Sequence, residues 1–74
     1  MINNYVNDKK FSIIYKNNNL NIINYSEITG FTDTEISIRY NDELYYIEGN
    51  ELVISKMIDN EILITGNISS VFFK

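Results

Sequence analysis

The stretch EISIRY, residues 35–40, indicates the fold more clearly than any other part of the sequence. Its Ile, Ile and Tyr alternate with Glu, Ser and Arg, and this period of two is typical of a strand with one face in water. Turn-forming residues precede it at 32–34 and follow it at 41–43. The stretch therefore predicts an antiparallel strand between two chain reversals.

Short apolar runs separated by turn residues continue in both directions from this strand. The chain contains 14 Ile, which is β-branched and favours strands, and 12 Asn, which tolerates left-handed backbone in turns. Residues 51–62 also partly fit a helical face, but their β-branched content favours a strand. We expect strands at residues 11–15, 20–25, 28–31, 35–40, 44–48, 52–58, 62–65 and 68–73. The predicted fold class is all-β: a small antiparallel meander of about six to eight short strands, forming a sandwich or a curled sheet, with no long helix.

A chain of 74 residues predicts a single domain. We expect a flexible N-terminal segment over residues 1–9, which are mostly polar, and one β domain over residues 10–74. The polar start does not resemble a signal peptide, and no apolar run approaches the length of a membrane span. The expected location is the cytoplasm.

Two Gly-Asn pairs lie at equivalent places in a weak internal echo. Gly49-Asn50 and Gly66-Asn67 each follow an apolar run and precede another. Hairpins with the same turn chemistry explain the echo, so both pairs are predicted as structural turns. A short β-solenoid-like stack is the alternative, because one coil stacked on the next also repeats its sequence.

Composition excludes several kinds of chemistry. The chain has no Cys and no His, which excludes disulfides, Cys/His metal sites and a His general base. Six Lys and Arg against ten Asp and Glu give a net charge of -4, which argues against nucleic acid as a partner. The acidic residues adjoin predicted turns, where carboxylates are usually solvated. We therefore assign no catalytic, cofactor-binding or metal residue and expect that the chain is not an enzyme.

The last predicted strand is the most apolar edge of the sequence. Val71, Phe72 and Phe73 give both of its faces apolar groups. Together with Tyr45 and Tyr46 they form the predicted partner surface, since aromatic residues are enriched where proteins bind one another. A homodimer, higher self-assembly or docking on another protein would cover this surface. The alternative is a two-layer sandwich that buries both faces internally.

Three tyrosines near one predicted hairpin admit two interpretations. Tyr40, Tyr45 and Tyr46 are suited to a glycan-binding surface, because tyrosine joins a large ring to a polar tip. Plain packing, with Tyr40 and Tyr45 paired across the hairpin, explains the same residues and is favoured.

An ordered series of positions over residues 20–73 resembles the YabP/YqfC family of small sporulation proteins. Phe73 takes the position of the family's final Phe. The series reads Leu20-x-Ile22-x-Asn24-Tyr25, Ile28, Thr32-Asp33-Thr34-x-Ile36-x-Ile38, Ile47-x-Gly49-x-x-Leu52-x-Ile54 and Glu61-Ile62-x-Ile64-x-Gly66-x-Ile68-x-Ser70-Val71-Phe72-Phe73.

The resemblance implies a non-enzymatic accessory protein of endospore formation. Such a protein acts in spore envelope or cortex development beside an integral membrane protein, on the mother-cell side. It implies no catalytic residue, because the shared positions are apolar or Gly. A self-assembling β structural protein and a small glycan-binding module are the alternative functions.

Overall fold

Two long strands form the centre of the fold. The computed structural model describes residues 10–73. Strand β5 (Glu43–Ile58) and strand β6 (Glu61–Phe73) pair antiparallel and are joined by a turn at residues 59–60. Four shorter strands complete the sheet, and residues 10–73 contain no helix. The shorter strands are β1 (Ser12–Lys16), β2 (Asn19–Ile23), β3 (Glu27–Phe31) and β4 (Glu35–Tyr40).

The six strands form one sheet in the order β1-β2-β6-β5-β4-β3. Strands β3 to β6 follow one another as a meander, and the β1–β2 hairpin adds to the far side of β6. The prediction of a small all-β fold with six to eight strands is confirmed. The solenoid-like alternative is excluded for the described part of the chain, because every strand pair is antiparallel whereas solenoid coils stack in parallel.

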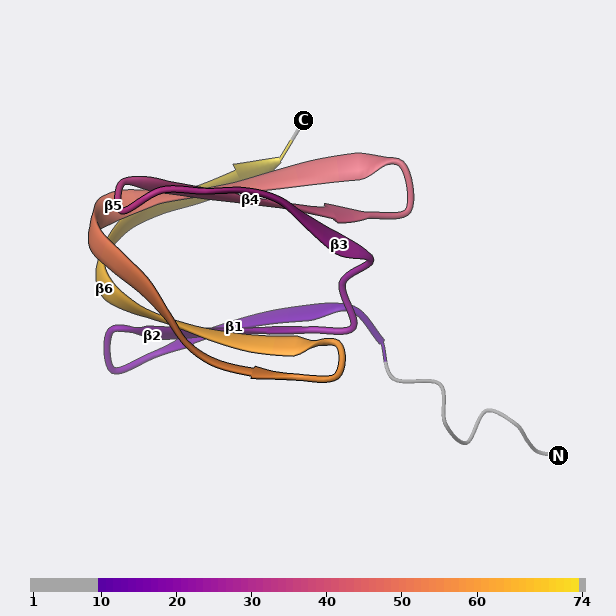
Figure 1. Cartoon of the computed structure of the whole chain (residues 1–74), viewed down its shortest axis with the longest axis horizontal. Helices are drawn as coiled ribbons and strands as arrows, with labels where there is room; N and C mark the ends of the chain where they lie inside the picture. Colours follow the sequence, from indigo (N-terminus) through magenta and orange to yellow (C-terminus); the bar gives the residue numbers. More distant parts are fainter. Residues whose placement is uncertain (1–9, 74) are drawn as a thin grey trace, which may run out of the picture.

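This sheet folds over on itself to make two layers. Strand β4 pairs with residues 43–48 of β5, whereas β2 pairs with residues 61–65 of β6. The two short hairpins therefore attach to opposite halves of the β5–β6 ladder. Figure 1 shows β5 and β6 bending at the left, where they pass from one layer to the other.

We name the layers by their strands. The first layer contains β3, β4, residues 43–48 of β5 and residues 68–73 of β6. The second layer contains β1, β2, residues 53–58 of β5 and residues 61–65 of β6. The predicted sandwich thus arises from a single curled sheet.

Two glycines lie where the ladder bends. A Cβ atom at Gly49 would overlap the carbonyl oxygen of Asn67, and one at Gly66 would overlap the carbonyl oxygen of Glu51. Gly66 also has a φ of 127°, a conformation that L side chains rarely adopt. The pairing register shifts on both sides of this region, so the bend is built from β-bulges.

The prediction of hairpin turns at Gly49-Asn50 and Gly66-Asn67 is wrong. Both pairs lie inside β5 and β6, so the strands predicted at 44–48 and 52–58 are one strand, as are those at 62–65 and 68–73. A bulge and a turn use glycine for the same conformational freedom, and the local sequence does not distinguish them. The segment predicted to be flexible, residues 1–9, lies outside the described residues.

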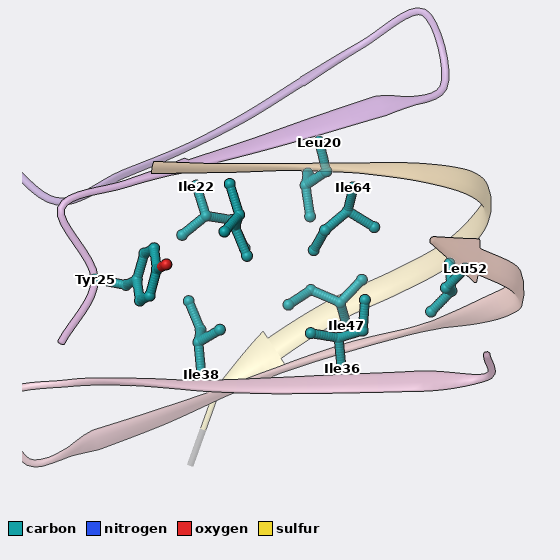
Figure 2. Close-up of a cluster of buried hydrophobic side chains, with 9 residues drawn as sticks. Leu20, Ile22, Tyr25, Ile36, Ile38, Ile47, Leu52 and Ile64 are labelled. Atoms are coloured by element: carbon teal, nitrogen blue, oxygen red, sulfur yellow. The ribbon is translucent and has the colours of Figure 1, made fainter. Parts of the chain in front are cut away.

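The space between the layers is filled by buried apolar side chains. Figure 2 shows them pointing toward one another from β2 and β6 on one side and from β4 and β5 on the other. Alternation along each strand places one face inward, and these side chains are almost completely removed from water. The core consists of Leu20, Ile22, Tyr25, Ile36, Ile38, Ile47, Leu52, Ile62 and Ile64.

Candidate protein-binding surface

The acidic residues do not gather into a site within the part of the chain that the structure describes. No group of three or more Asp and Glu in residues 10–73 has the arrangement of a metal site. Most carboxylates are exposed, and Arg39 forms an ion pair with Glu27 at 3.1 Å on the surface. The chemistry-bearing side chains are therefore dispersed, and attention turns to the aromatic residues.

The predicted partner residues are brought together on adjacent strands. In the β5–β6 ladder, Tyr45 pairs with Phe73, Tyr46 with Phe72 and Ile47 with Val71. Ile47 is completely buried, so alternation points Val71, Tyr45 and Phe73 toward the inside of the sandwich. Tyr46 and Phe72 point to the outer face of the first layer.

The outward pair forms a stacked aromatic contact. The ring centroids of Tyr46 and Phe72 are 5.4 Å apart and their planes are inclined by 17°. Phe72 remains 38% exposed although it stacks on Tyr46. A large rigid ring that is partly exposed on a β-sheet is a suitable anchor for another protein, since aromatic side chains lose little entropy on binding.

The inward pair belongs to an aromatic cluster at one end of the core. Phe11 stacks on Tyr40 with centroids 4.4 Å apart and also lies 4.9 Å from Tyr45, which in turn lies 5.4 Å from Phe73. The Tyr45 hydroxyl donates a hydrogen bond of 2.9 Å to Oε1 of Glu43. This hydrogen bond, and secondarily burial, raises the pKa of Tyr45.

The three tyrosines considered for glycan binding do not form one surface. Tyr40 and Tyr45 lie inside the sandwich end, whereas Tyr46 is on the outer face. The predicted pairing of Tyr40 with Tyr45 is wrong, because Tyr40 pairs with Glu43 and Tyr45 with Ile38. Phe11, which the sequence predicted only as the start of a strand, is the residue that contacts both tyrosines.

The open edge of β6 adds a second feature to this surface. Among residues 10–73, the pairing of β6 with β2 ends at residue 65. Beyond residue 65, β6 therefore pairs with β5 alone and its other edge is open. Val71 and Phe73 on this edge are 38% and 61% exposed. A shallow groove of about 220 Å³ runs between this edge and Tyr15 of β1, and Ile68, Ser69 and Ser70 complete its lining.

Tyr15 is a surface residue that the sequence did not reveal. Strand β1 is far from β6 in sequence, and only the folding of the sheet places the two edges beside each other. No local pattern predicts this neighbour, because the relation depends on which halves of β5 and β6 belong to each layer.

Comparison with known proteins gives one result. The YabP family profile matches residues 7–74. Neither the comparison with curated proteins nor the comparison with solved structures gave a match. None of the described residues belong to a helix long and apolar enough to cross a membrane. The family match covers almost the whole chain, and the chain belongs to the YabP family.

Proposed function

We propose that this protein is a non-enzymatic accessory protein of endospore formation that binds an integral membrane protein. Membership in the YabP family suggests a sporulation-related protein, and this family is not a known enzyme family. The observation that carries the binding role is the stacked pair Tyr46–Phe72 on the outer face of the first layer. The protein acts on the mother-cell side, held at the membrane through its partner, during development of the spore envelope or cortex.

The outer face of the first layer is suited to docking another protein. Leu44 lies on this face beside Arg39, and Tyr46 lies beside Ser37 in the β4–β5 ladder. Leu44 thus extends the apolar centre formed by the aromatic pair, and Ser37 and Arg39 belong to a polar rim. The ion pair between Arg39 and Glu27 belongs to that rim.

Affinity capture from detergent-solubilised sporulating cells of the native host tests this proposal. The tagged chain and a Tyr46→Lys variant serve as baits, and the captured proteins are identified by mass spectrometry. A lysine at residue 46 interrupts the aromatic centre of the face without altering the exposed edge of β6. Ile58→Lys is the matched control, since it adds the same charge to β5 at an exposed apolar position of the second layer.

The expected result is one integral membrane protein enriched by the wild type and by Ile58→Lys but lost from Tyr46→Lys. Circular dichroism of both variants verifies that they remain folded. Equal capture by all three baits would count against the aromatic face, and capture of no membrane protein would count against the proposed partner.

A further inference from the structure

The exposed large apolar side chains gather on the open edges of the two layers. Within residues 10–73, the open edges are β1, β3, residues 53–58 of β5 and residues 68–73 of β6. Unpaired strand edges template pairing with other chains. The exposed large apolar residues on these edges are Ile14, Tyr15, Phe31, Val53, Met57, Ile58, Val71, Phe72 and Phe73.

Three of these edges carry features that hinder pairing. Strand β1 is only five residues long and ends in Lys16. Strand β3 contains Glu27 and a register shift between Ile28 and Gly30. The β5 edge contains Lys56 beside another register shift. Charged residues, bulges and short strands are the usual means of blocking an edge. Residues 62–73, by contrast, contain no charged side chain. The edge of β6 has a register shift of its own, at Ser69 between Ile68 and Ser70, but unlike the other edges it carries no charge.

The sequence of this edge is complementary to itself when read antiparallel. A two-fold axis perpendicular to the sheet leaves each side chain on the same face of the sheet in both copies. Residues that face each other across the axis must therefore point to the same face, so the pairing is centred on one residue and not between two residues. If Val71 of one copy faces Val71 of the other, Phe72 faces Ser70, and Phe73 lies opposite the bulge at Ser69. Each large ring then meets a small side chain, and the two halves of the strand fit without opposing bulky groups.

Charge also favours a second copy at this edge. Of the ten Asp and Glu residues, all except Asp8 lie between residues 27 and 61. With a net charge of -4, two copies repel one another through most of their surfaces. The acidic side chain that contacts this edge is Glu48 of β5, whose carboxylate accepts a hydrogen bond of 3.4 Å from the Ser70 hydroxyl.

We propose that two copies of this chain associate through antiparallel pairing of β6 residues 70–72, with Val71 at the two-fold axis and the Ser69 bulge at each end of the pairing. The first layers of the two copies then form one continuous sheet. The pairing covers the exposed edge and places Phe73 of each copy over the groove that Tyr15 of β1 flanks. The stacked Tyr46–Phe72 pairs of both copies lie on the same outer face, so the dimer presents the surface used in the proposed function twice. The dimer itself does not depend on the proposed function.

Light scattering coupled to size-exclusion chromatography tests the association with the full chain. The wild type is expected at twice the mass of one chain, dissociating on dilution. Phe73→Lys places like charges beside the pairing strands and is expected to give a monomer. Ile58→Lys, at a similarly exposed residue on the β5 edge, is expected to remain a dimer. A wild-type monomer at all concentrations, or loss of the dimer in Ile58→Lys alone, overturns the proposal.

Cysteine cross-linking tests the register and does not depend on a destabilising charge. The chain has no Cys, so Ser70→Cys introduces a single thiol. In the proposed register the two thiols are diagonal neighbours on one face, with Cα atoms roughly 7–8 Å apart. A short bis-maleimide is expected to convert most of the protein to a covalent dimer, whereas Ser55→Cys on the β5 edge is expected to stay monomeric in denaturing gels. Equal cross-linking of both variants, or species that grow with concentration into open-ended assemblies, contradicts the two-fold pairing.

Discussion

Glycine and asparagine provide unusual backbone conformations at different places in this chain, and among residues 10–73 Glu51 and Asp59 also have positive φ. Asn17, Asn18 and Asn41 have positive φ in hairpin turns, and Asn24 has it in the link between the layers. Asn adopts this conformation more readily than other non-glycine residues. Gly49 and Gly66, by contrast, permit the close approach of two backbones at the bend. The two residue types are therefore not interchangeable.

Alanine substitution at the bend tests this distinction. Gly66→Ala is expected to lower the free energy of unfolding by about 2 kcal/mol or more, because the added Cβ adopts a strained φ and meets the carbonyl of Glu51. Gly30→Ala is the control. Its Cβ would lie 2.8 Å from the Ser37 hydroxyl, a side chain that can move, so we expect a loss of about 1 kcal/mol or less. Urea unfolding measures both, and equal losses would argue against the close backbone crossing.

Tyr25 links stability to alkaline pH. Burial raises the pKa of Tyr25 above its ordinary value of 10.0. The unfolded chain therefore loses this proton first, so stability is constant below the ordinary pKa and falls as the pH rises above it. Tyr25→Phe is expected to flatten this decline in urea unfolding at pH values on either side of 10.0. An unchanged decline in the variant would show that other groups cause it.

At the level of the elements, β5 and β6 explain both what the sequence predicted and what it did not. The strand at 35–40 was predicted with its bounds, and the strand predicted at 20–25 is found at Asn19–Ile23, because apolar and polar residues alternate over a sheet with one buried face. The sequence did not predict that β5 continues through Gly49 to Glu51. Glu51 has a φ of 55°, and its carbonyl group lies at the close crossing with Gly66, which is a long-range feature.

The candidate surface was partly predictable for a related reason. Val71, Phe72 and Phe73 were recognisable because an apolar strand end stands out in a polar sequence. Their division between the inner and outer faces, and the position of Tyr15 across the groove, follow from pairing between distant strands. Such long-range pairing leaves no mark in the local pattern.

Phe11 connects the first element of the chain to the opposite layer. It stacks on Tyr40 and also contacts Tyr45, and stacked aromatic pairs contribute about 0.5–1.5 kcal/mol beyond the area they bury. Phe11→Ala is therefore expected to lower the protection of β1 amides in hydrogen exchange more than that of β4 and β5.

Phe31→Ala is the comparison for this experiment. Phe31 is exposed on β3 and forms no aromatic ring pair among residues 10–73. Its replacement is expected to leave the exchange of β1 amides unchanged. Equal deprotection of β1 by both substitutions would contradict the role of the Phe11 contacts.

For the whole molecule, one curled sheet accounts for both stability and an exposed binding surface. A chain of this size buries only about 60% of the surface that its unfolded form exposes. Folding the sheet over at two glycines encloses a core that is mostly Ile and Leu, while within residues 10–73 the edges of both layers stay open. The same geometry that makes a small core possible leaves apolar residues available for other chains.

Complementation of a deletion strain tests the proposed role in endospore formation most directly. The gene is deleted in the native host and replaced by the wild type, by Tyr46→Lys or by the control Ile58→Lys, and heat-resistant spores are counted. The account predicts a loss of spores on deletion that the wild type and Ile58→Lys restore and Tyr46→Lys does not. Normal numbers of heat-resistant spores in the deletion strain would contradict it.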